Sequence, residues 1–397
     1  MAQPRVLYLS SWPIGARGEG AASFVYEQIE SLSPDVRALY VEHRFDSALG
    51  WARRRALGVD VETISDLWAG HVTALRMWTP RLSSRLTRRS VLGDVWHAGS
   101  MVAARTVRAL GGVDLVHSHV VLPAGLLGAA VAEALGIPLV LQEHSGPFDM
   151  HLDSEEKRDA VRRVLARARS VIAVSDQLAD RIRKFAGAGT RVDVVPNLVR
   201  TDLFVAAPTR DDAGDDIHLV CVSGLHPVKG LDTLLRAAAE LRARNCRVQL
   251  EIVGDGPVRP ELESLSRELG IADAVTLTGH LNRALVAERI AAADICVCAS
   301  RHETFGLAPA EALSVGRPVV STRCGGPESF VSGKCGALVP VDDAPAMADA
   351  IAATWCRRAE FDPAAMHEYV HARFGAGVFR GRVLRLYRDA LGDRAAA

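Results

Sequence analysis

The chain has 397 residues, of which 49% are hydrophobic and 24% are charged, and its formal net charge at pH 7 is zero. This length is too great for one ordinary hydrophobic core, so two globular domains are expected. The balanced charge gives no electrostatic footprint for general nucleic-acid binding, so we expect no nucleic acid as a partner.

Six short apolar runs in the N-terminal half indicate β-strands. The first begins five residues into the chain and is too short for the apolar core of a signal peptide. The runs lie at residues 5–10, 36–42, 115–119, 138–142, 171–174 and 192–195.

A glycine-rich loop follows the first of these strands and contains Gly15, Gly18 and Gly20. Glycine lets the backbone approach a ligand closely, although loops also use glycine for turns. The order Gly-x-x-Gly-x-Gly differs from the dinucleotide fingerprint Gly-x-Gly-x-x-Gly. This spacing argues against a dinucleotide site without excluding it, since Glu42 ends the second predicted strand.

Residues 44–98 are rich in tryptophan and arginine. These residues are Trp51, Trp68, Trp78 and Trp96, with Arg53, Arg54, Arg55, Arg81, Arg85, Arg88 and Arg89. One interpretation is a solvated helical insertion whose tryptophans pack on the domain. The other is peripheral contact with an anionic membrane surface, for which basic residues interleaved with tryptophan are suited.

Residues 120–141 carry a single charge, Glu133, and could be mistaken for a membrane span. They also contain three glycines and two prolines, which do not suit an uninterrupted apolar helix. Leucine and alanine spaced through 126–135 predict a buried helix that ends at Gly136 and leads into a strand.

The C-terminal half alternates strand and helix patterns. Strands are expected at residues 218–223, 249–253, 274–278, 294–299 and 318–321, and helices at 231–244, 261–269 and 283–292, with a further helix carrying Glu311. Apolar strands separated by amphipathic helices are typical of a parallel sheet covered on both faces. The fold class is therefore α/β, with two doubly wound, Rossmann-like domains facing a cleft.

The polar stretch 206–216 is interpreted as the linker between these domains. The expected organisation is an N-terminal Rossmann-like domain over 1–205, a C-terminal Rossmann-like domain over 217–376, and a closing helix over 377–397.

All seven cysteines lie at or after Cys221, and no secretion signal is predicted. An odd number of cysteines in this context favours reduced thiols and a cytoplasmic location. A zinc site from Cys296, Cys298, Cys324 and Cys335 lacks the usual paired spacing, so buried thiols are preferred and no metal is predicted.

Three residues of the C-terminal half have side chains suited to a phosphate-bearing, polyhydroxylated ligand. Lys229 follows the strand at 218–223, beside the start of a helix. A lysine there opposes the helix dipole, but it is well placed to bind a phosphate held against the helix N-terminus. Glu303 lies in a loop, and seven residues separate it from Glu311 on the helix that the loop opens. A helix N-terminus and a carboxylate would then meet at one place.

Histidines follow two strands of the N-terminal half. His144 comes just after the strand at 138–142, at the edge where parallel sheets bind ligands. His117 and His119 flank a similar strand end and are interpreted as structural lining residues.

These motifs, taken in order, resemble the retaining glycosyltransferases of family 4, which have the two-domain GT-B fold. The N-terminal half contributes Asp114-Leu-Val-His-Ser-His and Val195-Pro-Asn. The C-terminal half contributes residues 222–232, Gly254-Asp-Gly-Pro, Glu303-(seven residues)-Glu311 and Gly325-Gly-Pro-Glu328. The resemblance is specific over 222–340 and diffuse over 40–110.

The resemblance implies transfer of a sugar from a UDP- or GDP-linked donor to a hydroxyl acceptor, either a lipid-linked glycan or a small molecule. Lys229 would bind the diphosphate, Glu311 the ribose hydroxyls, and His144 the sugar and its phosphate. The residues implied as catalytic are His144, Lys229 and Glu303. Neither a divalent metal nor another cofactor is implied.

The remaining donor contacts implied by the resemblance come mostly from backbone. The loop around Gly18 and Gly20 would close over the diphosphate, and the nucleobase of the donor would lie near His280. The sugar and the diphosphate would be held by Glu303 and by the backbone amides of Phe305, Gly306 and Leu307.

One departure from the family pattern concerns the diphosphate. Many members carry arginine five residues before the lysine, where this chain has Gly224, and His226 or Arg301 are candidates to replace it. Two alternatives therefore stay open: a nucleotide-sugar epimerase or phosphorylase on the same fold, and a non-catalytic nucleotide-sugar-binding protein.

Overall fold

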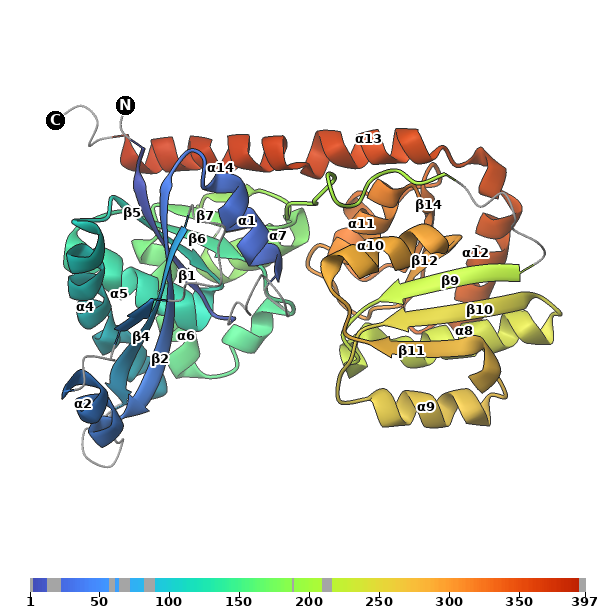
Figure 1. Cartoon of the computed structure of the whole chain (residues 1–397), viewed down its shortest axis with the longest axis horizontal. Coiled ribbons are helices and arrows are strands. Elements are labelled where there is room, and N and C mark those ends of the chain that lie inside the picture. The colour runs from blue at the N-terminus through green and yellow to red at the C-terminus, as the bar shows by residue number, and fades with distance from the viewer. Residues whose placement is uncertain are drawn as a thin grey trace. The chain divides into compact units, whose positions relative to one another are not determined.

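The computed structural model describes residues 3–12, 23–56, 61–63, 72–81, 90–187, 189–208 and 216–392. The chain forms two compact units. The N-terminal unit comprises residues 1–198 and 379–397, and the C-terminal unit comprises residues 199–378. Each unit is built on one β-sheet with helices packed against it (Figure 1).

The sheet of the N-terminal unit has the strand order β3-β4-β2-β1-β5-β6-β7-β8. Neighbouring strands pair in parallel, except that β3 is antiparallel to β4. The strands are β1 (Arg5–Ser10), β2 (Arg37–Ser47), β3 (Val61–Thr63), β4 (Val72–Arg81), β5 (Leu115–His119), β6 (Leu139–Glu143), β7 (Ser170–Ala173) and β8 (Val192–Val194). The six predicted strands are present.

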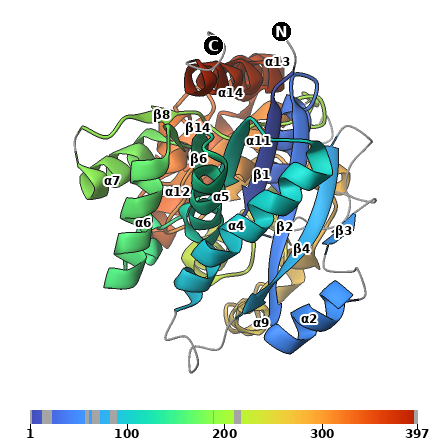
Figure 2. The ribbon, with the colours of Figure 1, turned by 90° about the vertical axis from the view of Figure 1, so that its left-hand side faces the viewer.

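Helices cover both faces of this sheet. They are α1 (Ser23–Leu32), α2 (Ala48–Ala56), α4 (Val91–Leu110), α5 (Leu126–Leu135), α6 (Glu155–Arg167), α7 (Asp176–Ala186) and α14 (Ala376–Leu391). Helix α5 packs against both α4 and α6, as Figure 2 shows. On the other face, Ile29 of α1 and Phe379 and Val383 of α14 share a core with Tyr8 and Leu115 of the sheet.

The structure corrects the interpretation of residues 44–98 as a helical insertion. Strand β2 continues to Ser47, and β4 pairs with it in parallel over ten residues. Arg76 obscured this strand in the sequence because it breaks the apolar pattern. Its guanidinium is bound by the buried Glu42 carboxylate, which faces it in the strand register, with Nη2 2.9 Å from Oε2. Trp78 of β4 is buried, so this tryptophan does pack on the domain.

The predicted buried helix is confirmed as α5, which ends at Gly136 in the left-handed conformation and leads into β6. Its residues from Leu126 to Ala132 are buried within the unit. Among the described helices, none combines the length and the hydropathy that crossing a bilayer requires.

The C-terminal unit has a fully parallel sheet with the order β11-β10-β9-β12-β13-β14. The strands are β9 (Asp216–Val222), β10 (Arg247–Val253), β11 (Val275–Gly279), β12 (Ile295–Cys298), β13 (Val319–Thr322) and β14 (Gly336–Val339). The five predicted strands are present, and β14 is a further one.

The helices of this unit are α8 (Leu231–Ala243), α9 (Arg259–Glu268), α10 (Arg283–Ala292), α11 (Leu307–Val315), α12 (Ala344–Cys356) and α13 (Pro363–Phe374). Leu234 of α8, Leu262 of α9 and Met347 of α12 share one core with Ile217 and Leu219 of β9. Figure 1 shows α10 and α11 on the opposite face.

All seven cysteines are free thiols, and Cys296, Cys298, Cys324 and Cys335 are buried. These four therefore act as small core side chains, as the preferred interpretation holds. In the part of the chain that the structure describes, no group of three or more potential metal ligands comes together.

Candidate functional site

Lys229 and Glu303 lie beyond the carboxyl ends of the neighbouring strands β9 and β12. After β9 the chain makes a 3-10 turn over Pro227–Lys229, and Gly230 then adopts φ 58° before α8 begins. The Lys229 Nζ donates to the Glu303 Oε1 at 2.6 Å. Ser300 Oγ donates to the same carboxylate oxygen at 2.7 Å. The sequence analysis did not identify Ser300, which helps to hold the Glu303 carboxylate in place.

This ion pair keeps Lys229 charged. The side chains are 25% and 18% exposed for Lys229 and Glu303. Burial on its own would lower the pKa of Lys229, but the charge and the hydrogen bond of Glu303 raise it above the ordinary value. A partly desolvated ammonium group is therefore available beside the start of α8, where an anionic ligand would gain most from it.

The segment between Glu303 and α11 is fixed by its packing. Phe305 is buried against Phe330 and Phe374, with ring centroids 5.5 and 5.2 Å away. Gly306 has φ 85°, and a Cβ there would lie 2.7 Å from the Cγ of Pro327. Leu307 begins α11. As at any helix N-terminus, the first N–H groups of α11 have no acceptor within the helix, so they suit an anion.

Glu311 is buried on α11 and forms an ion pair with Arg283, the first residue of α10. The Arg283 Nη2 lies 2.6 Å from the Glu311 Oε1, and the guanidinium carbon lies 4.8 Å from the ring centroid of Phe204. Arg283 was not predicted from the sequence. A signal was available, because arginine in the first turn of a helix opposes the helix dipole and needs a local anion.

The structure separates the two candidates for the cation missing at Gly224. Arg301 is held by Asp232 at 2.9 and 3.0 Å and by Asp342 at 2.8 Å, so its charge is already compensated. His226 is exposed, and its ring lies where a side chain on Gly224 would begin, with Cδ2 3.3 Å from a Cβ built there. Of the two candidates, His226 is therefore the one whose ring lies against Gly224.

Of three other residues predicted to contact the donor, the structure describes only His280. His280 is exposed directly after β11, the edge strand of the sheet. Gly18 and Gly20 lie outside the described residues.

In the N-terminal unit, His144 lies beyond β6 in a buried group of polar and aromatic residues. Its Nε2 is 3.0 Å from the Nδ1 of His119, and its Nδ1 is 3.1 Å from the Oδ1 of Asn197. The rings of Phe24 and Trp12 pack against it, with centroids 5.1 and 6.2 Å away. Burial lowers the pKa of His144 to about 3, so the imidazole is neutral.

Glu143 organises the loops around His144. The carboxylate is fully buried and accepts hydrogen bonds from the backbone N–H groups of Val121 at 2.7 Å, His144 at 2.9 Å and Ser145 at 2.7 Å. These bonds join the loop after β5 to the loop after β6. This role could not be predicted from the sequence, because all three donors to the carboxylate are backbone N–H groups.

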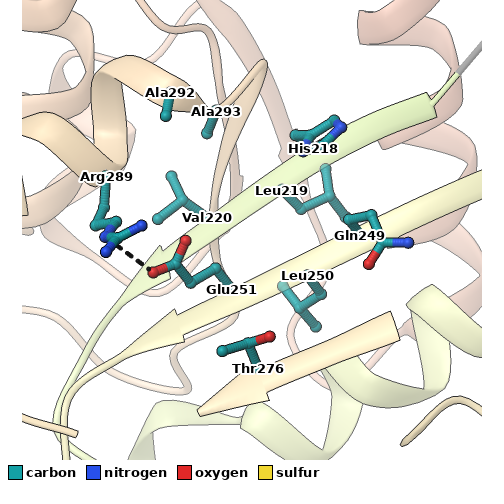
Figure 3. Close-up of a pocket in the computed structure, with 10 residues that line it drawn as sticks. All are labelled: His218, Leu219, Val220, Gln249, Leu250, Glu251, Thr276, Arg289, Ala292 and Ala293. Carbon is teal, nitrogen blue, oxygen red and sulfur yellow. Dashed lines mark ion pairs between the residues drawn. The ribbon is translucent and has the colours of Figure 1, made fainter. Parts of the chain in front are cut away.

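A separate pocket of about 420 Å³ lies on the face of the C-terminal sheet (Figure 3). His218, Gln249 and Thr276 contribute polar side chains, and Arg289 Nε pairs with Glu251 Oε1 at 3.5 Å on one wall. These residues lie within the strands or on α10, away from the carboxyl ends that carry Lys229 and Glu303. The pocket is therefore not part of the candidate site.

Two family models match the chain. One described as Glycosyltransferase Family 4 matches residues 48–203, and one described as Glycosyl transferases group 1 matches residues 216–356. D-inositol 3-phosphate glycosyltransferase 2 of Catenulispora acidiphila is 33% identical over 312 residues, which cover 71% of this chain and 72% of that protein. The chain belongs to glycosyltransferase family 4.

This family 4 glycosyltransferase is also similar to the Alpha-D-kanosaminyltransferase of Streptomyces kanamyceticus. The two are 32% identical over 240 residues, which span 56% of this chain and 62%, less than two thirds, of that relative. The structure of sucrose-phosphate synthase from Thermosynechococcus elongatus matches 99% of this chain and all of that one, with a TM-score of 0.76 and 22% identity. The predicted GT-B fold is thereby confirmed.

Proposed function

We propose that this glycosyltransferase moves a sugar from a UDP- or GDP-linked donor to a hydroxyl acceptor, with retention of the anomeric configuration. The observation that carries the proposal is the Lys229–Glu303 pair, which stands beside the N-terminus of α11. It supplies an ammonium group, a carboxylate and helix amides, which suit the diphosphate and the hydroxyl groups of such a donor.

Cleavage of the anomeric C–O bond builds positive charge on the sugar ring and negative charge on the diphosphate. The task of the protein is to aim fixed positive groups at that growing negative charge. In the proposed mechanism, Lys229 and the first amides of α11 are the groups that stabilise this negative charge. A charged lysine is required for this, and the Glu303 carboxylate keeps it charged.

Glu303 is poorly suited to act as a covalent nucleophile, because its Oε1 already accepts hydrogen bonds from Lys229 and Ser300. We therefore propose front-face attack. The bond from the anomeric carbon to the diphosphate breaks as the bond to the acceptor oxygen forms on the same face, and the departing phosphate takes the acceptor's proton.

Glu311 is proposed to accept hydrogen bonds from the ribose hydroxyls. Its carboxylate forms an ion pair with Arg283, whose Nη2 lies 2.6 Å from the Glu311 Oε1. A fixed anion accepts two neighbouring hydroxyl donors well, since hydrogen bonds to charged groups are about twice as strong as neutral ones.

We propose that transfer needs no divalent metal, since Lys229 and the amides of α11 would compensate the charge of the leaving group. Turnover measured in EDTA and again with added Mg²⁺ or Mn²⁺ tests this. Equal rates support it, whereas a rate that disappears in EDTA and returns with the metal contradicts it.

The proposed acceptor is the hydroxyl of a small polar molecule or of a lipid-linked glycan. The name of the Catenulispora relative specifies an inositol phosphate, which supports a small polyol for this chain as well. Inositols, amino sugars and polyprenyl-linked sugars therefore form the first panel of acceptors to test.

The experiment that tests the function begins with thermal shifts for a panel of nucleotide sugars. A donor at 100 times its dissociation constant stabilises the folded protein by about 2.7 kcal/mol. The donor that raises the melting temperature is then incubated with each acceptor, and the anomeric configuration of the product is read by NMR. A retained product supports the proposal, and an inverted product contradicts it.

The family assignment favours transfer over the epimerase, phosphorylase and binding-protein alternatives. A donor incubated without acceptor discriminates further. An epimerised sugar would support an epimerase, and calorimetric binding of the donor without transfer to any acceptor would support a binding protein.

We also propose a cytoplasmic location with peripheral contact at an anionic membrane surface through α2. Arg53, Arg54 and Arg55 lie on this short helix, and Leu49 is 81% exposed. The charge of Arg54 is partly compensated, because its Nε pairs with the Asp46 Oδ2 at 2.8 Å. Sedimentation with vesicles containing anionic lipid tests the contact, and Leu49→Ser with Arg53→Ser should release the protein.

A further inference from the structure

A row of stacked and hydrogen-bonded side chains runs through the buried interior of the N-terminal unit. His117 and His119 lie on the same face of β5, with their rings stacked and the centroids 4.5 Å apart. The ring of His119 stacks on that of His144 at 5.3 Å. The Nδ1 of His117 bonds to the Tyr387 hydroxyl of α14 at 2.6 Å.

The partners of His144 define which of its ring nitrogens carries the proton. The Asn197 Oδ1 already accepts from the Nε2 of Gln28 at 3.0 Å, and a carbonyl oxygen can only accept. The His144 Nδ1, 3.1 Å from the same oxygen, must therefore donate. In a neutral ring the His144 Nε2 is then an acceptor, so the His119 Nδ1 carries the proton between them.

Neutrality of these rings follows from burial. His144 has its pKa lowered to about 3 by burial, and burial followed by the charges of His117 and His144 lowers the pKa of His119 well below its ordinary value. The titratable groups packed around His144 are the two histidines of β5 and the carboxylate of Glu143. That carboxylate accepts hydrogen bonds from the backbone N–H groups of Val121, His144 and Ser145.

We propose that His119 is a positioning residue for glycosyl transfer. By donating from Nδ1 to the Nε2 of His144, it fixes the ring plane and the tautomer of His144. This rests on the proposed function and on a contact between His144 and the donor sugar, which the resemblance to family 4 implies. Because both nitrogens of His144 are engaged within the unit, His144 acts through its fixed place and not as a general acid or base.

Substitutions that keep or remove one N–H group test this inference. The Nδ2 of asparagine can take the place of the histidine Nδ1, whereas glutamine places its amide near the position of Nε2, and leucine has no donor. His119→Asn should keep kcat within about 2-fold, while His119→Gln and His119→Leu should lower it by about 10-fold, the effect of one lost hydrogen bond.

Melting temperatures of the three variants show that each is folded. A loss of kcat in His119→Leu and His119→Gln that His119→Asn rescues supports the positioning role. Equal activity in all three variants, or equal loss in all three, overturns it.

The tautomer is measured separately by long-range ¹⁵N–¹H NMR spectra of the full-length, histidine-labelled protein between pH 5.5 and 8. We expect a neutral His144 with the proton on Nδ1 throughout in the wild-type protein and in His119→Asn. An Nε2–H tautomer, or an imidazolium at pH 6, overturns the inference.

The two readouts separate the inference from the function on which it rests. A wild-type protein that transfers sugar, with the Nε2–H tautomer at His144, contradicts only the role of His119. A wild-type protein that transfers no sugar from any donor overturns the proposed function and with it the role in transfer, even where the Nδ1–H tautomer is found.

Discussion

At the scale of single residues, Gly224 determines how the turn after β9 would meet a diphosphate. Arg301 cannot supply the missing charge from its present position, because Asp232 and Asp342 hold its guanidinium. His226 lies against Gly224 and is exposed, so its ring can move aside. The left-handed conformation that restricts side chains occurs at Gly230 but not at Gly224.

Gly224→Arg should therefore strengthen donor binding, since the new guanidinium would stand beside Lys229. A charge-assisted hydrogen bond contributes about 1.5–3 kcal/mol, which lowers the dissociation constant of the donor by about 10-fold or more. Calorimetry measures this change. Gly224→Gln is the matched control of similar length without charge, and arginine that binds the donor no better than glutamine would contradict the prediction.

At the scale of elements, the Arg283–Glu311 pair joins the first turn of α10 to α11. Glu311 is almost fully buried, so the removal of Arg283 takes an ion-pair partner away from a buried carboxylate. Breaking a buried ion pair on one side commonly costs 3–5 kcal/mol, whereas exposed pairs contribute less than about 1 kcal/mol.

Arg283→Ala should lower the free energy of unfolding of the protein by about 3 kcal/mol, measured by urea denaturation. The double variant Arg283→Ala with Glu311→Gln should recover part of this loss, because the buried carboxylate that lost its ion-pair partner is replaced by a neutral amide. Arg289→Ala on the same helix is the control. The Arg289 Nε lies 3.5 Å from the Glu251 Oε1, and the Arg289 side chain is half-exposed. Equal losses for Arg283→Ala and Arg289→Ala would refute the argument.

Most strands and helices could be predicted from sequence because their apolar patterns are local. Strand β4 could not, because Arg76 breaks the pattern and is compensated by Glu42 on β2, 34 residues earlier. Strand β14 is four residues long and begins with Gly336, which has φ 151° and a Cβ position only 1.8 Å from the Val319 carbonyl oxygen. The need for glycine at position 336 becomes apparent only when the neighbouring strand β13 is in place.

Some features of the candidate site could likewise be predicted from the sequence, and others could not. Lys229, Glu303 and Glu311 could be predicted because each follows a strand or opens a helix, and the order of parallel strands brings such positions to one edge. The contacts of His144 could not be predicted, because Asn197 and His119 are 53 and 25 residues away in the chain. The pairing of Arg283 with Glu311 likewise depends on how two helices pack.

At the scale of the whole molecule, the lowered histidine pKa values gather in the N-terminal unit. Burial lowers the pKa of His117 and His144 to about 3 and of His43 to about 4, from an unfolded value of 6.5. A histidine that stays neutral when folded binds fewer protons than the unfolded chain below pH 6.5. Its contribution to stability is present above that pH and is lost as the pH falls toward the folded value.

Acidification from pH 7 to pH 5 should therefore destabilise the N-terminal unit by about 2 kcal/mol for each of these imidazoles. Five of the six tryptophans precede residue 97, and Trp355 is the sixth. Tryptophan fluorescence of the Trp355→Phe variant consequently reports urea unfolding of the N-terminal unit. We expect a lower urea midpoint at pH 5 than at pH 7 and little change from these groups between pH 7 and pH 8. Equal midpoints at pH 5 and pH 7 would show that the imidazoles are not held neutral.

The account as a whole depends on Lys229 as the cation that meets the leaving diphosphate. The most direct measurement is the turnover number for glycosyl transfer in wild-type protein and in Lys229→Ala, with Lys334→Ala, an exposed lysine of the same unit, as control. We predict a fall of about 10–100-fold in Lys229→Ala and no change in Lys334→Ala, as one charge-assisted contact to the transition state implies. Wild-type turnover in a folded Lys229→Ala protein would contradict the account.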